Sequence, residues 1–219
     1  MTPTGTAGEW ADALRARLRA HWLLKALGIT TSISAFMALY LWLAQHPLFV
    51  ITPMPELALD RWIPFTHWAV LPYLSLWIYI GSVPGLLEPR RELPPYLLCV
   101  VLLAVVGCVV FVLFPTAVTQ PDIDWSRWPV LAWLKATDQT RNACPSLHIA
   151  YAVLTAIWLR RLLRKVAAPR WLHGINVLWC LTIIWSTLAL RQHVLLDGLA
   201  GAAMALAASW LVPRPRSTW

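Results

Sequence analysis

Two short stretches of the sequence hold residues whose types and spacing suit nucleophilic or acid–base chemistry. In the first, His193 and Asp197 are four residues apart, so on a helix both side chains lie on one face within reach of each other. A carboxylate that accepts the Nδ1 proton of an imidazole leaves Nε2 free to attack. We therefore predict that His193 is a nucleophile oriented by Asp197. A purely structural hydrogen bond is the alternative.

In the second stretch, His148 follows Ser146 at the start of an apolar run. Serine is a favoured helix N-cap, and Pro145 helps to end the preceding loop, so a helix is predicted to begin here. The N–H groups and the dipole at such a helix start bind anions. Arg141 and Arg191 stand beside the two helix starts, and arginine pairs well with phosphate. Contact with lipid headgroups is the alternative for either arginine.

Two imidazoles, one carboxylate and two arginines suit displacement at phosphorus. One histidine attacks, the other protonates the leaving oxygen, and the cations stabilise the charge of the transition state. This scheme requires no metal and no cofactor, and we expect neither. The four cysteines show no paired spacing, and three of them lie in apolar runs, so we expect neither disulfides nor a zinc site.

The composition is that of a membrane protein, with 59% hydrophobic residues, 13% charged residues and a mean hydropathy of +0.61. The fifteen tryptophans fit the interface between headgroups and acyl chains. The net charge of +8 does not indicate nucleic acid, because the basic residues flank apolar segments and form no single stripe.

A helix that crosses the hydrocarbon layer needs about 20 apolar residues. Six segments meet this need: 22–45, 67–87, 96–118, 146–164, 171–190 and 194–212. They predict an all-α, polytopic six-helix bundle that forms one domain over residues 1–219, with the segment 1–21 and the tail 213–219 in the cytoplasm. The span 146–164 is the weakest, because Arg160 and Arg161 lie near its end.

The distribution of lysine and arginine predicts the orientation of this bundle. With both termini inside, most of the 18 Lys and Arg residues fall on the cytoplasmic side. Spans 146–164 and 194–212 then both begin at the outer face, so His148 and His193 are predicted to share one outward-facing site. The expected location is a bacterial inner membrane with the site on its periplasmic face.

The motifs resemble those of the type-2 phosphatidic acid phosphatase superfamily, specifically the branch similar to inositol phosphorylceramide synthases. The matching residues are Pro145-Ser146-Leu147-His148, Arg191-Gln192-His193, Asp197, Gly198 and Ala200-Gly201. The resemblance implies that His193 forms a phosphohistidine, that Asp197 supports it and that His148 protonates the departing oxygen. It also implies that Ser146 helps to bind phosphate, partly through its backbone N–H.

The sequence departs from the family pattern at positions that bind phosphate. Thr187 stands where the family places an arginine, and Arg191 is expected to compensate. The segment 114–121, FPTAVTQP, lacks the lysine and arginine of the first family motif. Arg141 is the expected substitute, ahead of Lys135 and Arg127, because it lies closest in sequence to the turn that is predicted to bind the anion.

Three readings of function follow. The leading one is a lipid phosphatase that acts on a lipid monophosphate or isoprenoid diphosphate, with a phospholipid or polyprenyl phosphate as substrate. The second is a phosphotransferase of the inositol phosphorylceramide synthase type, which passes through the same covalent intermediate. The third is a non-catalytic membrane carrier or haem binder.

Two further segments allow simpler roles. The stretch 53–68 is either a lid over the headgroup or a plain amphipathic connector. The basic run 160–165 is interpreted as a cytoplasmic anchor for anionic lipid headgroups.

Overall fold

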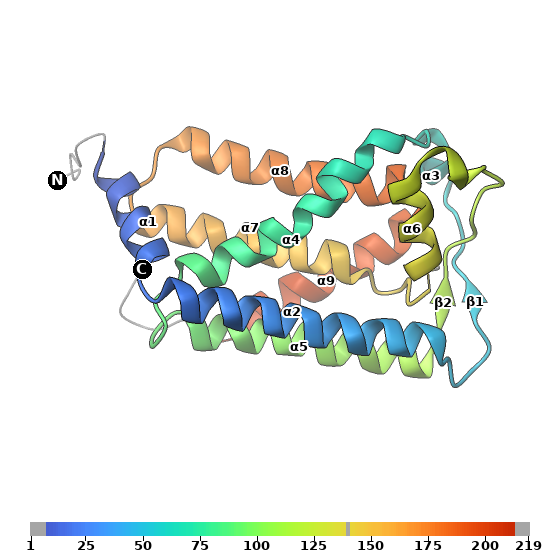
Figure 1. Cartoon of the computed structure of the whole chain (residues 1–219), viewed down its shortest axis with the longest axis horizontal. Helices are drawn as coiled ribbons and strands as arrows, with labels where there is room; N and C mark the ends of the chain where they lie inside the picture. The colour runs from blue at the N-terminus through green and yellow to red at the C-terminus, as the bar shows by residue number, and fades with distance from the viewer. Residues whose placement is uncertain (1–7, 139–140, 213–219) are drawn as a thin grey trace.

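The computed structural model of the chain describes residues 8–138 and 141–212, so the expected tail 213–219 and the first seven residues of the segment 1–21 lie outside the described residues. The described chain is helical apart from one two-stranded ribbon, which confirms the all-α class. Its long helices are α2 (Trp22–Gln45), α4 (Val70–Leu86), α5 (Leu93–Leu113), α7 (Leu147–Lys165), α8 (Arg170–Ala189) and α9 (Leu195–Leu211). They lie side by side, and the chain runs up and down through them (Figure 1).

Shorter elements close the two ends of this bundle (Figure 1). One end holds α1 (Glu9–Arg19), and we call it the α1 end. The other holds β1 (Thr52–Pro53), β2 (Thr116–Ala117), α3 (Ala58–Trp62), α6 (Pro129–Asp138) and the 3-10 turns His67–Ala69 and Trp125–Arg127, and we call it the ribbon end. The strands β1 and β2 pair in parallel, with Thr52 opposite Thr116.

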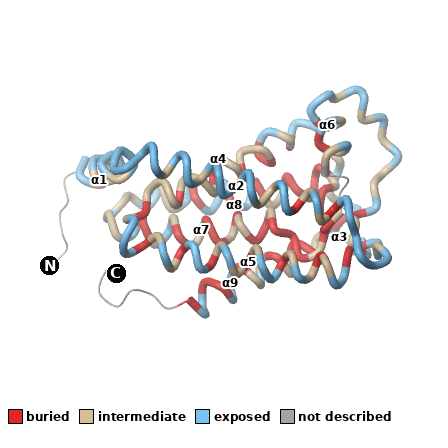
Figure 2. Tube along the Cα trace, turned by 60° about the horizontal axis from the view of Figure 1, so that its bottom comes forward, coloured by how far each residue is buried: buried red, intermediate tan, exposed pale blue. Residues whose placement is uncertain are grey.

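Helix α7 is the centre of the bundle, although its span is the weakest in the sequence. It packs against α9, α8, α4 and α5, and residues along its whole length are buried. Figure 2 shows buried residues along α7 and exposed residues along much of α1 and α2. The position of α7 explains how two motifs at its start and at the start of α9 come together.

By length and composition, four helices of the described chain are apolar enough to cross a membrane. They are α2, the continuous helix His67–Leu86, α5 and α8. Helix α9 is apolar but has 17 residues, and α7 carries Arg160, Arg161, Arg164 and Lys165 near its end. These apolar helices indicate an integral membrane protein. On this measure four helices of the described chain qualify, so the expected count of six is not confirmed.

The third predicted span, 96–118, is wrong at its end. Helix α5 stops at Leu113, because Pro115 has no N–H to donate and excludes the residue before it from the helical region. Phe114 accordingly has φ −136° and ψ 68°. The chain then extends into β2, so that part of the segment 114–121 lies across the ribbon end.

Glycines allow α9 to lie directly against the start of α7. A Cβ atom on Gly201 would stand 2.2 Å from the carbonyl oxygen of Ser146, and one on Gly198 would stand 2.7 Å from Cδ1 of Ile149. Small residues permit this approach of two helix backbones. The motif glycines Gly198 and Gly201 therefore serve helix packing.

A cluster of charged residues closes the α1 end. Arg17 donates to Glu92 at 2.8 Å and to Glu88 at 3.0 Å, and Lys165 donates to Glu92 at 2.5 Å. Lys25 joins α2 to this cluster by donating to the carbonyl oxygen of Arg17. Burial raises the pKa of Glu92, but hydrogen bonds from Lys165, from the N–H of Glu88 and from Arg17 outweigh burial and hold that pKa below its usual value.

Candidate functional site

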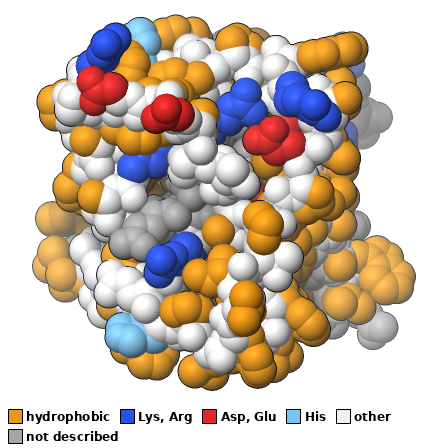
Figure 3. Space-filling model, turned by 90° about the vertical axis from the view of Figure 1, so that its right-hand side faces the viewer, with side chains coloured by type: hydrophobic (Ala, Val, Ile, Leu, Met, Phe, Trp, Pro, Cys, Tyr) orange, Lys and Arg blue, Asp and Glu red, His pale blue; other side chains and the backbone are white. Residues whose placement is uncertain are grey.

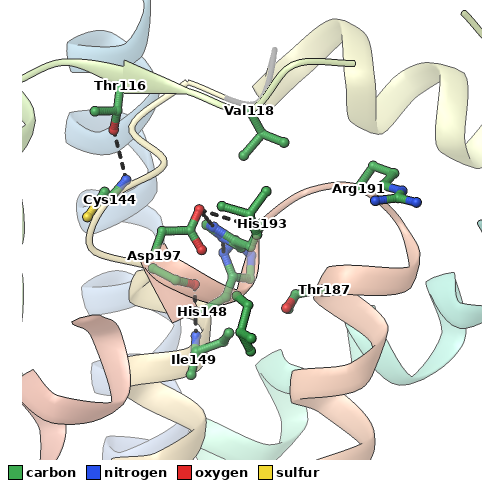
Figure 4. Close-up of polar contacts among 12 residues, drawn as sticks. Thr116, Val118, Cys144, His148, Ile149, Thr187, Arg191, His193 and Asp197 are labelled. Atoms are coloured by element: carbon green, nitrogen blue, oxygen red, sulfur yellow. Dashed lines mark hydrogen bonds and ion pairs between the residues drawn. The ribbon is translucent and has the colours of Figure 1, made fainter. Parts of the chain in front are cut away.

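His148 and His193 meet at the ribbon end. Nε2 of His193 lies 3.4 Å from Nδ1 of His148, and Nδ1 of His193 lies 3.2 Å from Oδ2 of Asp197. Figure 4 shows the three side chains pointing toward one another from the start of α7 and from the loop and first turn of α9. Asp197 is fully buried and His193 is 5% exposed. The pairing of His193 with Asp197 leaves its Nε2 facing the second imidazole.

Tyr73 of α4 extends this row of groups. Its hydroxyl lies 2.8 Å from Nε2 of His148, and the two rings stack with centroids 4.9 Å apart. The order Tyr73, His148, His193, Asp197 leaves Nδ1 of His148 directed at His193. Sequence analysis missed Tyr73, because an aromatic residue near the end of a span usually anchors it at the membrane interface.

The end of α8 sets the position of His193. The N–H of Gln192 donates to the carbonyl of Thr187 and the N–H of Arg191 to that of Leu188, which is the Schellman closure of a helix. The N–H of His193 also donates to the Thr187 carbonyl. Thr187, which stands in place of the family arginine, thus holds the nucleophile candidate by its backbone.

Arg191 occupies the left-handed position of this closure, with φ 55°. Glycine is usual there, and another residue needs support from its surroundings. Nη1 and Nη2 of Arg191 donate to the carbonyl oxygens of Asp60 and Ile63, at 2.9 and 3.0 Å. Its own carbonyl accepts hydrogen bonds from Gln120 and Lys135. Figure 4 shows the guanidinium directed away from His193.

Asp60 of α3 joins the segment 53–68 to the site. Its side chain is buried, with Oδ1 accepting from the N–H of Leu195 at 2.7 Å and Oδ2 from the N–H of Leu57 at 2.8 Å. Asp60 therefore satisfies an unpaired N–H at the start of α9. Only folding brings this residue to the site, and no local signal in the sequence marks it.

Ser146 caps α7 as predicted, because its Oγ accepts from the N–H of Ile149. Its own N–H donates to the carbonyl of Asp197 at 3.0 Å. This N–H already holds α9, so the predicted contact with phosphate would have to replace that hydrogen bond. The N–H groups of Leu147 and His148 start the helix and have no acceptor within it.

Arg141 is held between the end of α2 and strand β2. Nη1 of Arg141 donates to the carbonyl of Ala44 at the end of α2, and its backbone forms a bridge with Ala117 of β2. Beside this bridge, Oγ1 of Thr116 accepts from the N–H of Cys144. The segment that lacks the family cations thus holds the loop before α7 in place.

The comparison with known proteins agrees with this geometry. A family model for the PAP2 superfamily matches residues 95–218, which include most of α5 and all of α7, α8 and α9. The chain belongs to the PAP2 superfamily. Members of this superfamily are generally phosphatases or phosphotransferases, and their substrates are phosphorylated small molecules or lipids. No curated protein and no solved structure matches the chain.

An apolar groove of about 540 Å³ reaches the site of this PAP2 protein from the side. It runs between α2, α4, α5 and α7, from Lys25 near the α1 end to Tyr40 and His148 at the ribbon end. Gly28 and Gly81 lie on its wall. Because apolar residues dominate its lining, the groove suits a hydrocarbon chain whose polar head lies at His148.

Two buried polar groups of the PAP2 site have no hydrogen-bond partner among residues 8–138 and 141–212. They are Oδ1 of Asp197 and the side-chain amide of Gln192, which is 2% exposed. Within the same residues, no three His, Cys, Asp or Glu side chains gather to hold a metal ion. Figure 3 shows the ribbon end, where Lys and Arg side chains reach the surface among polar and backbone atoms.

Proposed function

We propose that the chain is an integral membrane lipid phosphatase that hydrolyses a lipid monophosphate or isoprenoid diphosphate through a phosphohistidine at His193. The observation that carries this proposal is the contact between Nε2 of His193 and Nδ1 of His148 at the head of an apolar groove. We also propose that, within the superfamily, the chain belongs to the branch similar to inositol phosphorylceramide synthases.

In the first step, Nε2 of His193 attacks phosphorus, and the bond from phosphorus to the lipid oxygen breaks. Nδ1 of His148 gives its proton to that oxygen, and Asp197 holds the Nδ1 proton of His193. In the second step, water attacks phosphorus, the bond to His193 breaks, and His148 takes up the proton from water. Since the two imidazoles lie 3.4 Å apart, they must separate when a phosphoryl group enters between them.

We also propose Ser146, Arg191 and Arg141 as contacts of the phosphate. Oγ of Ser146 lies at the start of α7, where the helix dipole favours an anion. Both arginines donate to carbonyl oxygens in the structure, so they must exchange these acceptors for phosphate oxygens when substrate binds. Arginine gains from this exchange, because its hydrogen bonds to charged acceptors are stronger.

The proposed orientation has six crossings, both termini in the cytoplasm and the ribbon end at the periplasmic face of a bacterial inner membrane. In support, α7 and α9 lie alongside the four apolar helices, and their 19 and 17 residues correspond to about 28 and 25 Å. Arg17 and Lys165 are then on the inner side, as the distribution of positive charge requires.

The decisive experiment measures phosphate release by the purified chain from phosphatidate, phosphatidylglycerol phosphate and polyprenyl diphosphate. We expect His193→Ala to lose about a thousandfold or more in kcat. Asp197→Asn should also lose much of its kcat, but less than His193→Ala. Full activity in both variants would overturn the mechanism. Adding a lipid alcohol or inositol tests the phosphotransferase alternative, because a transferase forms a new phosphodiester in place of free phosphate.

Substitution in the groove tests whether the substrate is a lipid. A Cβ atom on Gly28 meets nothing within 4 Å, and Gly28 lines the groove, so Gly28→Leu should fill part of the groove. We expect a lower kcat/KM for long-chain substrates and an unchanged value for a short-chain analogue. Gly8→Leu, at an exposed position before α1 where a Cβ atom also meets nothing within 4 Å, is the matched control outside the groove. Equal effects on both chain lengths would exclude the groove as the tail site.

A further inference from the structure

The basic residues near the end of α7 serve two different purposes. Arg161 donates to the carbonyl of Ser209 and lies over the ring of Trp158, and Lys165 pairs with Glu92. Both side chains are therefore engaged inside the bundle. Arg160 and Arg164 point elsewhere, because they lie four residues apart on another face of the helix.

Arg160 and Arg164 line a cavity of about 560 Å³ together with Arg170, His173 and Gly174 at the start of α8. Within the described part of the chain, none of the three arginines forms an ion pair or donates a hydrogen bond to a protein group. Like charges at this spacing repel one another. The cavity therefore concentrates positive charge that nothing in the described protein neutralises.

The surroundings of this cavity identify the chemistry of its ligand. On α8, Ile175 is 52% exposed and Leu178 is 65% exposed, and both follow the cavity along the outer surface of the helix. Trp171, at the same turn as Arg170, is 57% exposed, as expected for a residue at a membrane interface. A ligand with an anionic head and apolar chains matches both surfaces, whereas free phosphate matches only one.

We propose that the cavity between the end of α7 and the start of α8 binds the headgroup of an anionic phospholipid, whose chains lie along α8. The site is separate from the histidines, because α7 places its first and last residues about 27 Å apart. Basic pockets between helices on the cytoplasmic side of a membrane recognise such headgroups.

Retention of lipid by the full chain, measured by native mass spectrometry from mixed phosphatidylglycerol and phosphatidylcholine micelles, tests this site. We expect retention of phosphatidylglycerol, roughly tenfold weaker in the double variant Arg160→Gln with Arg164→Gln. The double variant Arg90→Gln with Arg91→Gln removes the same charge from exposed positions in the turn before α5 and should retain lipid normally. All four side chains are exposed, so folding should not be affected.

Three outcomes would overturn the proposal. One is equal retention by the wild-type chain and the Arg160 and Arg164 double variant. Another is an equal loss in the Arg90 and Arg91 control, which would indicate attraction by net charge alone. The third is displacement of phosphatidylglycerol by millimolar inorganic phosphate, which would indicate a phosphate site. The single variant Arg164→Gln, with a smaller expected loss, provides a second measurement.

Discussion

At the α1 end, Arg17 and Lys165 pair with the buried carboxylate of Glu92, whereas at the ribbon end Arg191 and Arg141 donate to backbone carbonyl oxygens. The ribbon end does contain buried carboxylates, but Asp60 accepts from backbone N–H groups and Asp197 lies against His193. Glu92 thus neutralises Arg17 and Lys165, whereas neither Arg191 nor Arg141 forms an ion pair within the described residues.

The two sets of cations therefore have different roles: those paired with Glu92 stabilise the fold, and Arg191 and Arg141 remain available to an anionic substrate. A carbonyl dipole holds a guanidinium in place but leaves its full positive charge, so Arg191 and Arg141 still attract an anion. In the cluster around Glu92, Arg17 and Lys165 are paired with a carboxylate, and these hydrogen bonds join α1, α5 and α7. We therefore expect changes in the cluster around Glu92 to alter stability and changes at the histidines of the ribbon end to alter catalysis.

Glu92→Gln should have the largest effect on stability. It leaves Arg17 and Lys165, which are 14% and 21% exposed, without their shared carboxylate. Breaking a buried pair costs about 3 kcal/mol or more, so the melting temperature in detergent should fall by several degrees. The kcat at low temperature should be unchanged. Glu56→Gln, at an exposed position, is the control, and an equal fall in that variant would remove the distinction between the two ends.

Gly201→Ala should weaken the ribbon end by about 1–3 kcal/mol, because the new methyl group stands too close to the carbonyl of Ser146. Phosphate release should fall as well, since the same contact positions α7 and α9. Gly174→Ala meets nothing within 4 Å and should instead stabilise its helix by roughly 0.5–1 kcal/mol. Thermal unfolding of both variants measures the contrast, and the same sign in both would contradict it.

Tyr73→Phe should have a smaller effect, of about tenfold or less in kcat, because one hydrogen bond to His148 contributes about 0.5–1.5 kcal/mol. If His148 is the general acid, the loss should be larger for an alkyl phosphate than for p-nitrophenyl phosphate, whose leaving group needs little protonation. Tyr79→Phe, which loses a hydroxyl bonded to Asn176, should leave this ratio unchanged. Equal losses with both leaving groups would assign Tyr73 a structural role.

Of the predicted effects, the pH dependence of stability should be the smallest near neutral pH. Because the folded-state pKa of Glu92 is lowered, its contribution is complete above the usual glutamate pKa and is lost as pH falls through the lower folded value. Melting curves of the wild type should therefore shift downward in this acidic range, and those of Glu92→Gln should shift less. Parallel shifts in the two proteins would assign the effect to other groups.

Much of the fold was predictable from hydropathy, and the exceptions have physical causes. The predicted spans coincide with the long helices to within a few residues, except where Pro115 ends α5 early. The sequence predicts Arg17 to lie in the cytoplasmic segment 1–21 and Lys165 to contact lipid headgroups, because it does not show that Glu92 lies between them. Helix α7 is central although its cations make its span the weakest in the sequence.

Some contacts of the candidate site join residues close in sequence, and others join residues far apart. The spacing of His193 and Asp197 and the cap at Ser146 are local, so the sequence reveals them. Tyr73 reaches His148 across 75 residues and Asp60 reaches Leu195 across 135, and no periodicity encodes such contacts. The roles proposed for Arg141 and Arg191 follow from their positions beside the two helix starts, and the carbonyl oxygens that hold both side chains could not be foreseen.

The closure at the end of α8 fixes the number of residues between this helix and His193. Since the Thr187 carbonyl holds His193 directly, adding one residue to α8 would turn its end by about 100° and advance it by about 1.5 Å. The imidazole would then swing out of line with its partners. Helix α8 can therefore exchange its lipid-facing side chains freely over evolution, while single insertions and deletions within it are forbidden.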